Sequence, residues 1–234
     1  MKSWSLIPIL ALVALQTGCV VGRRTFDLPV PAAAVVPEAS RGSVHIASVT
    51  DDRKFENKPS DPSVPSIDGD VSKMSTALKD HMIGRQRNTW GHAMGDISLP
   101  PDESVTRKAR VLVEQGLRSA GYRVTDDPKA ANSVAISVNE FWAWTTPGFV
   151  SLTFEAKIGC ALTVHGTDGS THTAMVRGYG KNSGQVGSDG NWQEAYAPAF
   201  ADFEKNLGSA VDQLGLAGTL HAASSHPSSG EPSQ

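Results

Sequence analysis

The residues best placed to do chemistry follow an alternating apolar run at positions 134–138. Glu140, Trp142 and Trp144 are spaced two apart, so on a single strand they project to the same side. An acid beside two indoles offers a large, rigid platform suited to a sugar ring, a peptide or a partner surface. The structural alternative is that the strand end leaves the helix layer, with Glu140 in water and both indoles covering the sheet edge. We predict a contact surface here, not a catalytic centre.

A second polar group, Asp51-Asp52-Arg53, closes the first predicted strand of the domain. Loops that follow strands often carry function, so Asp52 and Arg53 are assigned to the same predicted binding surface. A solvated turn with a local ion pair is the simpler alternative, because surface ion pairs are common and weak.

A third group lies in a stretch rich in glycine and polar residues. Arg85, Arg87 and Asn88 beside Trp90 have the chemistry to bind a phosphate or a glycan. Three polar residues in such a loop do not by themselves specify a ligand.

Motifs for the common enzyme classes are absent. The sequence has no G-x-S-x-G, H-E-x-x-H, P-loop or C-x-x-C, and its seven histidines form no close pair on a helix. We therefore expect no metal site, no cofactor and no catalysis. A hydrolase of cell-wall polymers that uses Glu140 is the rival, and it needs a second carboxylate about 5–10 Å away. Asp51, Asp52 and Glu155 are the candidates for that second acid.

Length and composition indicate one soluble domain with tails. The chain has 234 residues, 39% of them hydrophobic and 19% charged, with a net charge of −3. No basic field is available for nucleic acid. The two cysteines are Cys19 and Cys160, and Cys160 lies on the apolar face of a predicted strand. We expect it to be a buried, reduced thiol.

Hydrophobic periodicity organises these residues around a hairpin at 133–166, with Pro147-Gly148 at its turn. A third strand at 171–180 follows, and a first strand starts near Ser43. A clear helix is expected over 103–120 and a final one ending at Gly215, with a short helix at 71–84 and a glycine-rich polar loop at 84–103. The fold class is α+β: a mixed, mostly antiparallel sheet with two helices packed on one face.

The first residues, MKSWSLIPILALVALQTGC, hold one lysine, a short apolar run and small residues before Cys19. Leu-Gln-Thr-Gly-Cys resembles the lipobox of bacterial lipoproteins, with Gln16 where leucine is usual. The resemblance implies cleavage before Cys19, fatty acylation such as palmitate on that residue, and, because Val20 follows, the outer membrane. We expect a signal peptide at 1–18, a lipid-anchored tether at 19–42, one domain at 43–215 and a disordered tail at 216–234.

The run from Ile83 to Val124, with the strand SVNEFWAWTTPGF, resembles the YajG-type family of bacterial lipoproteins. That resemblance implies a small periplasmic domain similar to the amino-terminal domain of TolB, with no settled activity. We therefore expect a lipid-anchored, non-catalytic protein on the periplasmic face of the outer membrane, which binds an envelope protein or glycan. A structural subunit of an envelope complex remains the third alternative.

Overall fold

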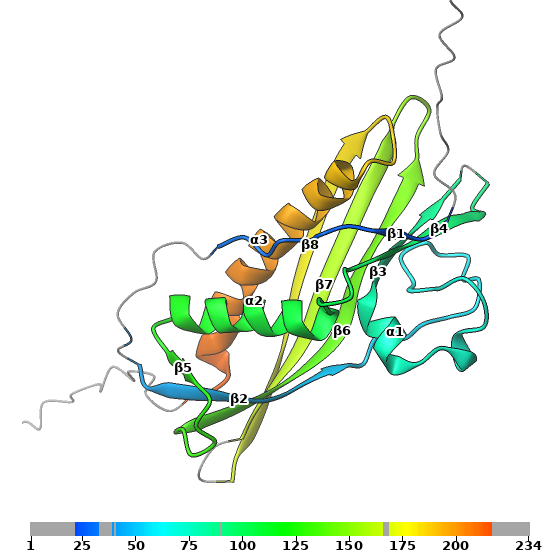
Figure 1. Cartoon of the computed structure of the whole chain (residues 1–234). Coiled ribbons are helices and arrows are strands. Elements are labelled where there is room, and N and C mark those ends of the chain that lie inside the picture. The colour runs from blue at the N-terminus through cyan, green and yellow to red at the C-terminus, as the bar shows by residue number, and fades with distance from the viewer. Residues whose placement is uncertain (1–21, 33–38, 40, 89, 166–168, 217–234) are drawn as a thin grey trace, which may run out of the picture.

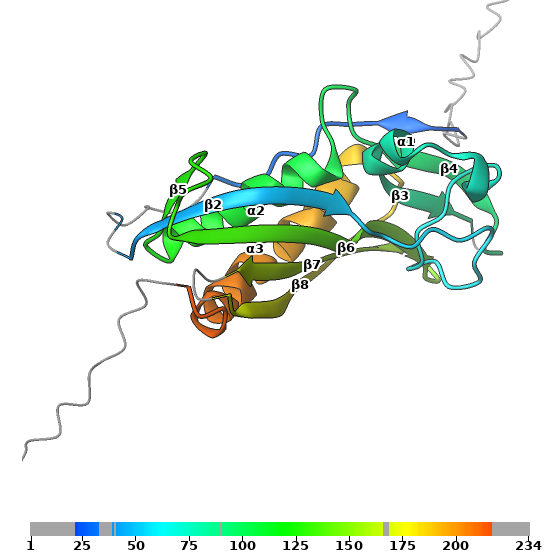
Figure 2. The same ribbon diagram turned by 90° about the horizontal axis from the view of Figure 1, so that it is seen from below.

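The computed structural model describes residues 22–32, 39, 41–88, 90–165 and 169–216. One mixed sheet forms its centre, and the two long helices lie side by side on one face of it (Figures 1 and 2). The strands are β1 (Arg24–Thr25), β2 (Ser43–Asp51), β3 (Met82–Arg87), β4 (Ala93–Ser98), β5 (Arg123–Thr125), β6 (Asn132–Pro147), β7 (Leu152–His165) and β8 (Thr171–Gly184). The helices are η1 (Val71–Lys73, a 3-10 turn), α1 (Thr76–His81), α2 (Val105–Ser119) and α3 (Asp189–Gln213).

Strands β6, β7 and β8 form an antiparallel meander, as their alternating sequences predict. On its other edge, β6 is shared by two strands that both run parallel to it. β2 pairs with 132–138, and β3 pairs with Gly84 opposite Ala143 and Arg85 opposite Trp144. The predicted α+β class with both long helices on one face is confirmed.

Helix α2 begins and ends where its sequence indicates, and α3 ends where expected but begins within a stretch that reads as a loop in the sequence. The Ser104 hydroxyl accepts the Arg107 amide at the start of α2, and Gly121 adopts a left-handed φ of 88° after its end. Helix α3 ends before Gly215, whose φ is 63°. Their apolar stripes bury Leu117 and Phe203 completely or almost so against the sheet.

A β-bulge at Asn139 changes the face on which the second half of β6 projects. Val138 pairs with Cys160, but Glu140 pairs with Gly159, so one residue of β6 is inserted there. A bulge of this kind moves every following side chain to the opposite face. Val138 and Phe141 therefore both reach the helix-side core. The even spacing from Val134 predicts that Glu140, Trp142 and Trp144 lie on the face of Val134, and this prediction is wrong because of the inserted residue.

The expected loop at 84–103 is largely a hairpin. β3 and β4 pair antiparallel, and the turn between them is closed by the Asn88 amide bonded to the His92 carbonyl at 2.9 Å. The helix expected at 71–84 is correspondingly shorter, because Met82 already belongs to β3. Alternation in this hairpin is broken by glycines and register shifts, so its sequence does not have a strand signature.

Part of the expected tether belongs to the packed domain. β1 pairs in parallel with β4, and the side chains of Phe26 and Leu28 lie in the core with 7% and 1% exposure. At the other end, Leu216 is buried as well. The signal peptide, Cys19 and the tail from 217 lie outside the described residues.

Candidate functional site

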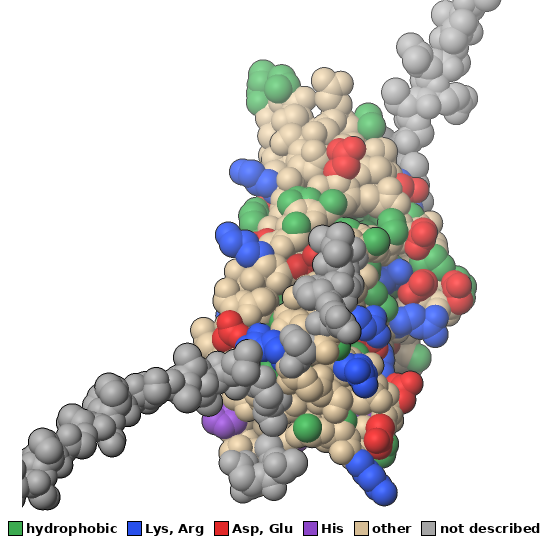
Figure 3. All heavy atoms as spheres, turned by 90° about the vertical axis from the view of Figure 1, so that its left-hand side faces the viewer, with side chains coloured by type: hydrophobic (Ala, Val, Ile, Leu, Met, Phe, Trp, Pro, Cys, Tyr) green, Lys and Arg blue, Asp and Glu red, His purple; other side chains and the backbone are tan. Residues whose placement is uncertain are grey.

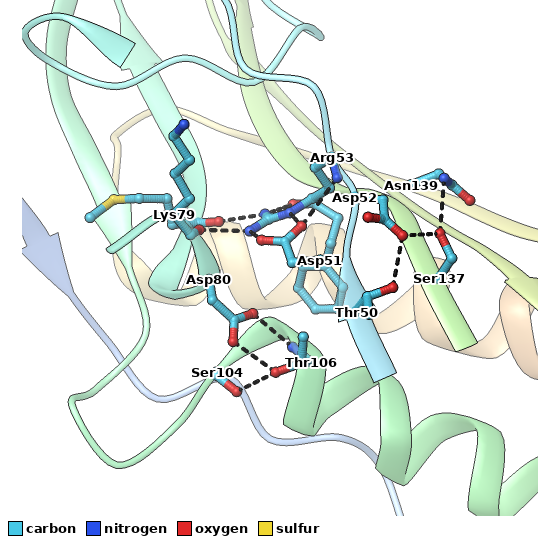
Figure 4. A network of polar contacts seen from close by, with 12 residues as sticks. Thr50, Asp51, Asp52, Arg53, Lys79, Asp80, Ser104, Thr106, Ser137 and Asn139 are labelled. Carbon is cyan, nitrogen blue, oxygen red and sulfur yellow. Dashed lines mark hydrogen bonds and ion pairs between the residues drawn. The ribbon is translucent and has the colours of Figure 1, made fainter. Parts of the chain in front are cut away.

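Arg53 is buried and holds several elements together, with its side chain fully shielded (Figure 4). Its Nε and Nη2 donate to the two carboxylate oxygens of Asp51 at 2.7 and 2.8 Å. The remaining donors reach three main-chain oxygens at 2.6–2.8 Å, those of Lys79, Met82 and Phe141. All five N–H groups of the guanidinium are therefore satisfied.

This Arg53 network occupies the place where β2 leaves β6 and β3 joins it. β2 pairs with β6 as far as Val138, and β3 pairs from Ala143, so the Phe141 carbonyl lies between the two. Arg53 donates to that carbonyl and so satisfies a buried acceptor that neither strand serves. The placement of Arg53 on a binding surface is therefore wrong, because none of its donors remains for a partner.

Asp52 points away from Asp51, as Figure 4 shows, and is exposed. It accepts from the hydroxyls of Ser137 at 2.5 Å and Thr50 at 2.7 Å. These two hydrogen bonds lower the pKa of Asp52. Its role as a binding residue remains a prediction.

Glu140 lies on the face opposite the helices and is flanked by cations. Its two carboxylate oxygens are each 3.5 Å from a cationic nitrogen, Lys157 Nζ and Arg177 Nε. The side chain is 30% exposed. This arrangement is that of an ion-pair cluster on a solvated sheet face.

Trp142 and Trp144 do not form an exposed platform. Trp142 is fully buried and Trp144 is 8% exposed, in a second apolar cluster with Ile67 and Met82. The Trp142 indole N–H donates to the Pro62 carbonyl at 3.2 Å, and its ring meets that of Phe55 edge-on. After the bulge both indoles face away from α2 and α3, and the segment from Phe55 to His81 folds over them. This segment thus covers the surface that we expected to be open.

An open cavity does exist at the third group of residues. Two adjoining hollows over β3 and β4 share Asp68, Arg85 and Ala93 and measure about 260 and 540 Å³. We call them together the Arg85 hollow. The smaller is completed by Gly22, Arg23, Met94, Gly95 and Asp96, and the larger by Lys58, Pro59, Ser60, Arg87, Trp90, Gly91 and His92.

Arg85 is the buried charge of this hollow, with 7% exposure. It lies opposite Asp96 in the β3–β4 ladder, yet its Nε is 3.4 Å from Asp96 Oδ1 and makes no hydrogen bond with any described residue. Its Nη2 is 3.5 Å from Asp68, whose side chain is 91% exposed. Arg85 therefore has charge partners but no closely bonded acceptor at Nε, which is unusual for a buried guanidinium.

Arg87 adds a second positive charge to the same wall. Its Nη1 donates to the Gly91 carbonyl at 3.2 Å, and its Nη2 is 3.5 Å from the Ser66 hydroxyl. Burial, followed by the nearby charge of Arg85, lowers the pKa of Arg87. Trp90 stands beside these charges with 82% exposure. Two arginines and an indole around an open hollow are suited to a phosphate or carboxylate on a ring-bearing ligand.

The remaining findings concern Cys160, metal ligands and membrane-spanning helices, none of which involves the Arg85 hollow. Cys160 is a free, fully buried thiol, as predicted, and burial raises its pKa to about 12. Within the described ranges, no group of three or more His, Cys, Asp or Glu side chains is placed to hold a metal ion. No helix in the same part of the chain is long and apolar enough to cross a membrane.

The sequence indicated Arg85, Arg87 and Trp90 of this hollow, but it did not indicate Asp96, Arg23 or the loop at 58–68. Asp96 joins it through the unexpected β3–β4 hairpin, and Arg23 joins through the packed N-terminal segment. The R-x-R spacing within a strand was the signal that could have placed both arginines on one face.

Comparison with known proteins gives a family match over part of the chain. Residues 91–196, from the turn before β4 to the first turns of α3, match the model of a family described as uncharacterized lipoprotein. No curated protein matches the chain.

Solved structures of similar outline have low identity to this chain. A crystal structure of an uncharacterized protein is 8% identical, covers 82% of this chain and 99% of that chain, and gives a TM-score of 0.38. Protein XCC0632 from Xanthomonas campestris is 13% identical over 82% of this chain and 91% of that chain, with a TM-score of 0.37. The PelC dodecamer from Paraburkholderia phytofirmans is 10% identical over 78% and 96%, with a TM-score of 0.31. The expected likeness to YajG-type proteins and TolB stays a prediction, whereas over residues 91–196 the chain is similar to lipoproteins of uncharacterized function.

Proposed function

We propose that this protein is a lipoprotein, anchored through Cys19 to the periplasmic face of the outer membrane, that binds an anionic envelope partner without catalysis. The lipobox-like leader and the match to uncharacterized lipoproteins support the anchor. The partner is a cell-wall polymer or an envelope protein that presents a phosphate or carboxylate to the Arg85 hollow.

The observation that carries the binding role is the state of Arg85. A buried guanidinium normally has its donors engaged in short hydrogen bonds, and Arg53 in the same fold shows this arrangement. Arg85 instead has two ion pairs of 3.4 and 3.5 Å and a hollow in front of it. An anion that enters the hollow would give it bidentate hydrogen bonds in place of long contacts.

Catalysis at Glu140 receives less support from the same geometry. A general acid or base needs a reacting group within hydrogen-bond reach and a site that excludes water. Glu140 is paired with Lys157 and Arg177 on the solvated face of the sheet.

The binding role is tested with the full-length protein in detergent micelles and two oligosaccharides of equal length, one phosphorylated and one neutral. Trp90 is the reporter, because its indole lines the hollow. We expect a saturable change in tryptophan emission with the phosphorylated sugar that weakens as salt is added. Arg87→Gln should weaken that binding, whereas Arg177→Gln, an exposed arginine on β8, should leave it unchanged.

Equal binding of the neutral sugar, or equal loss in both variants, would contradict an anion site at Arg85. Fractionation of the Cys19→Ser variant tests the anchor separately. That variant should leave the membrane fraction or stay unprocessed, and retention in the outer membrane after high-salt washing would exclude lipid attachment at Cys19.

A further inference from the structure

Three turns that carry exposed apolar side chains lie at one end of the sheet. The β6–β7 turn follows Pro147, and Gly184 of β8 is in register with Leu152 beside it, so the β8–α3 loop starts at the same end. β3 runs parallel to β6, which places its turn to β4 at that end as well. In Figure 1 this is the upper end of the molecule.

The apolar side chains of these turns are unusually open. Phe149 is 104% exposed, Val150 78% and Val186 64%, and with Trp90 they are four of the six large hydrophobic residues exposed among the described residues. Figure 3 shows hydrophobic side chains at this extremity of the molecule. We call Trp90, Phe149, Val150 and Val186 the apolar tip. One exposed apolar side chain is ordinary, but several large ones gathered at one end of a molecule mark a site of contact with a protein or a membrane.

The N-terminal segment enters the domain at the same end. The Gly22 amide donates to the Met94 carbonyl of β4 at 2.9 Å. Arg24 donates to the Gly187 carbonyl and to Asp189, which ties the segment to the β8–α3 loop. Cys19 precedes Gly22 by three residues in the sequence, and three residues span at most about 10 Å.

We propose that the apolar tip docks on the lipid bilayer, with its side chains at the boundary between headgroups and acyl chains. The proposal rests on the proposed anchor, because a lipid on Cys19 would hold this end within about 10 Å of the membrane surface. Tryptophan and other large apolar side chains on short turns favour that boundary. Arg23, 47% exposed at the same end, would lie at the level of the lipid phosphates.

Trp90 gives a direct readout of this orientation. Of the tryptophans in the described residues, Trp142, Trp144 and Trp192 are buried, so contact with lipid falls on Trp90. The full-length acylated protein is reconstituted into phosphatidylglycerol-containing vesicles with and without lipids brominated on the acyl chain. We expect brominated lipid to remove most of the Trp90 emission, obtained as the difference from Trp90→Phe.

The matched control moves the reporter to the far end. Lys129 is exposed in the β5–β6 loop, opposite the tip along β6. In the variant Trp90→Phe with Lys129→Trp, brominated lipid should leave the emission unchanged. Phe149→Asp with Val150→Asp should keep the protein on the vesicles but weaken the quenching of Trp90.

The outcomes separate the anchor from the docking. A protein that does not float with vesicles at all refutes the lipid anchor. A protein that floats while Trp90 is not quenched refutes the docking alone. Quenching of the Lys129→Trp variant by brominated lipid to the same extent as Trp90 would also overturn the proposed orientation. So would a tip that is buried by a second copy of the chain and shows no effect of bromine.

Discussion

Two arginines of this fold, Arg53 and Arg85, are buried to nearly the same extent, with 6% and 7% exposure, but their surroundings differ. Arg53 has a bidentate carboxylate and three main-chain oxygens within 2.8 Å. Arg85 has two ion pairs of at least 3.4 Å and faces an open hollow. Burial alone therefore does not show whether a charged side chain is structural or available for binding. The number and the length of its hydrogen bonds distinguish the two roles.

The neighbouring tryptophans differ in the same way. Trp142 lies under the segment that carries Arg53 and Phe55 and is fully buried. Trp90 lies at the rim of the Arg85 hollow and is mostly in water. We infer that the Arg53 region is structural and that the Arg85 region is available for binding.

We expect the largest effect from Arg53→Met, which should lower the free energy of unfolding. It would leave the buried carboxylate of Asp51 and three main-chain oxygens without their donor, so we expect a loss of about 3–5 kcal/mol. Arg85→Met should cost about 1–2 kcal/mol, because Asp96 keeps the Asp68 amide and Arg23 as partners. Urea denaturation at pH 7 measures both. Equal losses would mean that the two arginines have the same structural role.

The tryptophans extend the comparison to apolar side chains. Trp142→Ala should destabilise the protein by about 3–5 kcal/mol, because the indole fills the second apolar cluster. Trp90→Ala, at an exposed position, should cost less than about 0.5 kcal/mol. Thermal and chemical unfolding of the two variants provide the check. A small loss for Trp142→Ala would return that side chain to the surface on which we first expected it.

Cys160 shows how a closed site responds to pH. Burial raises its pKa to about 12, against about 8.5 in an unfolded chain. The buried thiol therefore stabilises the fold fully below pH 8.5, and that stabilisation is lost as pH rises toward 12. The decline should be about 1.4 kcal/mol for each pH unit in that window.

Cys160→Ala isolates this contribution, because the pKa of Tyr179 is also raised and its effect is common to both proteins. The difference between the two stability curves should grow above pH 8.5. Rapid labelling of Cys160 by a thiol reagent in the native protein would show instead that this strand face is open.

The sequence was sufficient for the elements with unbroken periodicity. β7 alternates without interruption, and α2 carries a full apolar stripe between Ser104 and Gly121, so their bounds and buried faces agree with expectation. The bulge at Asn139 has no comparable signature. It depends on pairing with β7 and on how β2 and β3 share one edge of β6, and neither is visible along one strand.

The candidate site was less predictable because it is made by long-range contacts. Arg85 and Arg87 were identifiable as residues able to bind an anion, but Asp96, Arg23 and the loop at 58–68 reach them only through tertiary packing. Arg53 was assigned to the surface because charged side chains at strand ends are mostly solvated. Its acceptors come from α1, β3 and β6, which a local pattern cannot show.

The most direct test of the comparison is arginine-selective modification by phenylglyoxal, read residue by residue by mass spectrometry, with and without the phosphorylated oligosaccharide. Arg87 should react readily, because its side chain lines the open hollow, and the ligand should slow its modification and that of Arg85. Arg53 should stay unmodified with or without ligand until the protein unfolds. Modification of Arg85 and Arg87 at a rate that saturating ligand does not change, or of Arg53 in the native protein, would contradict the assignment of binding to one arginine and structure to the other.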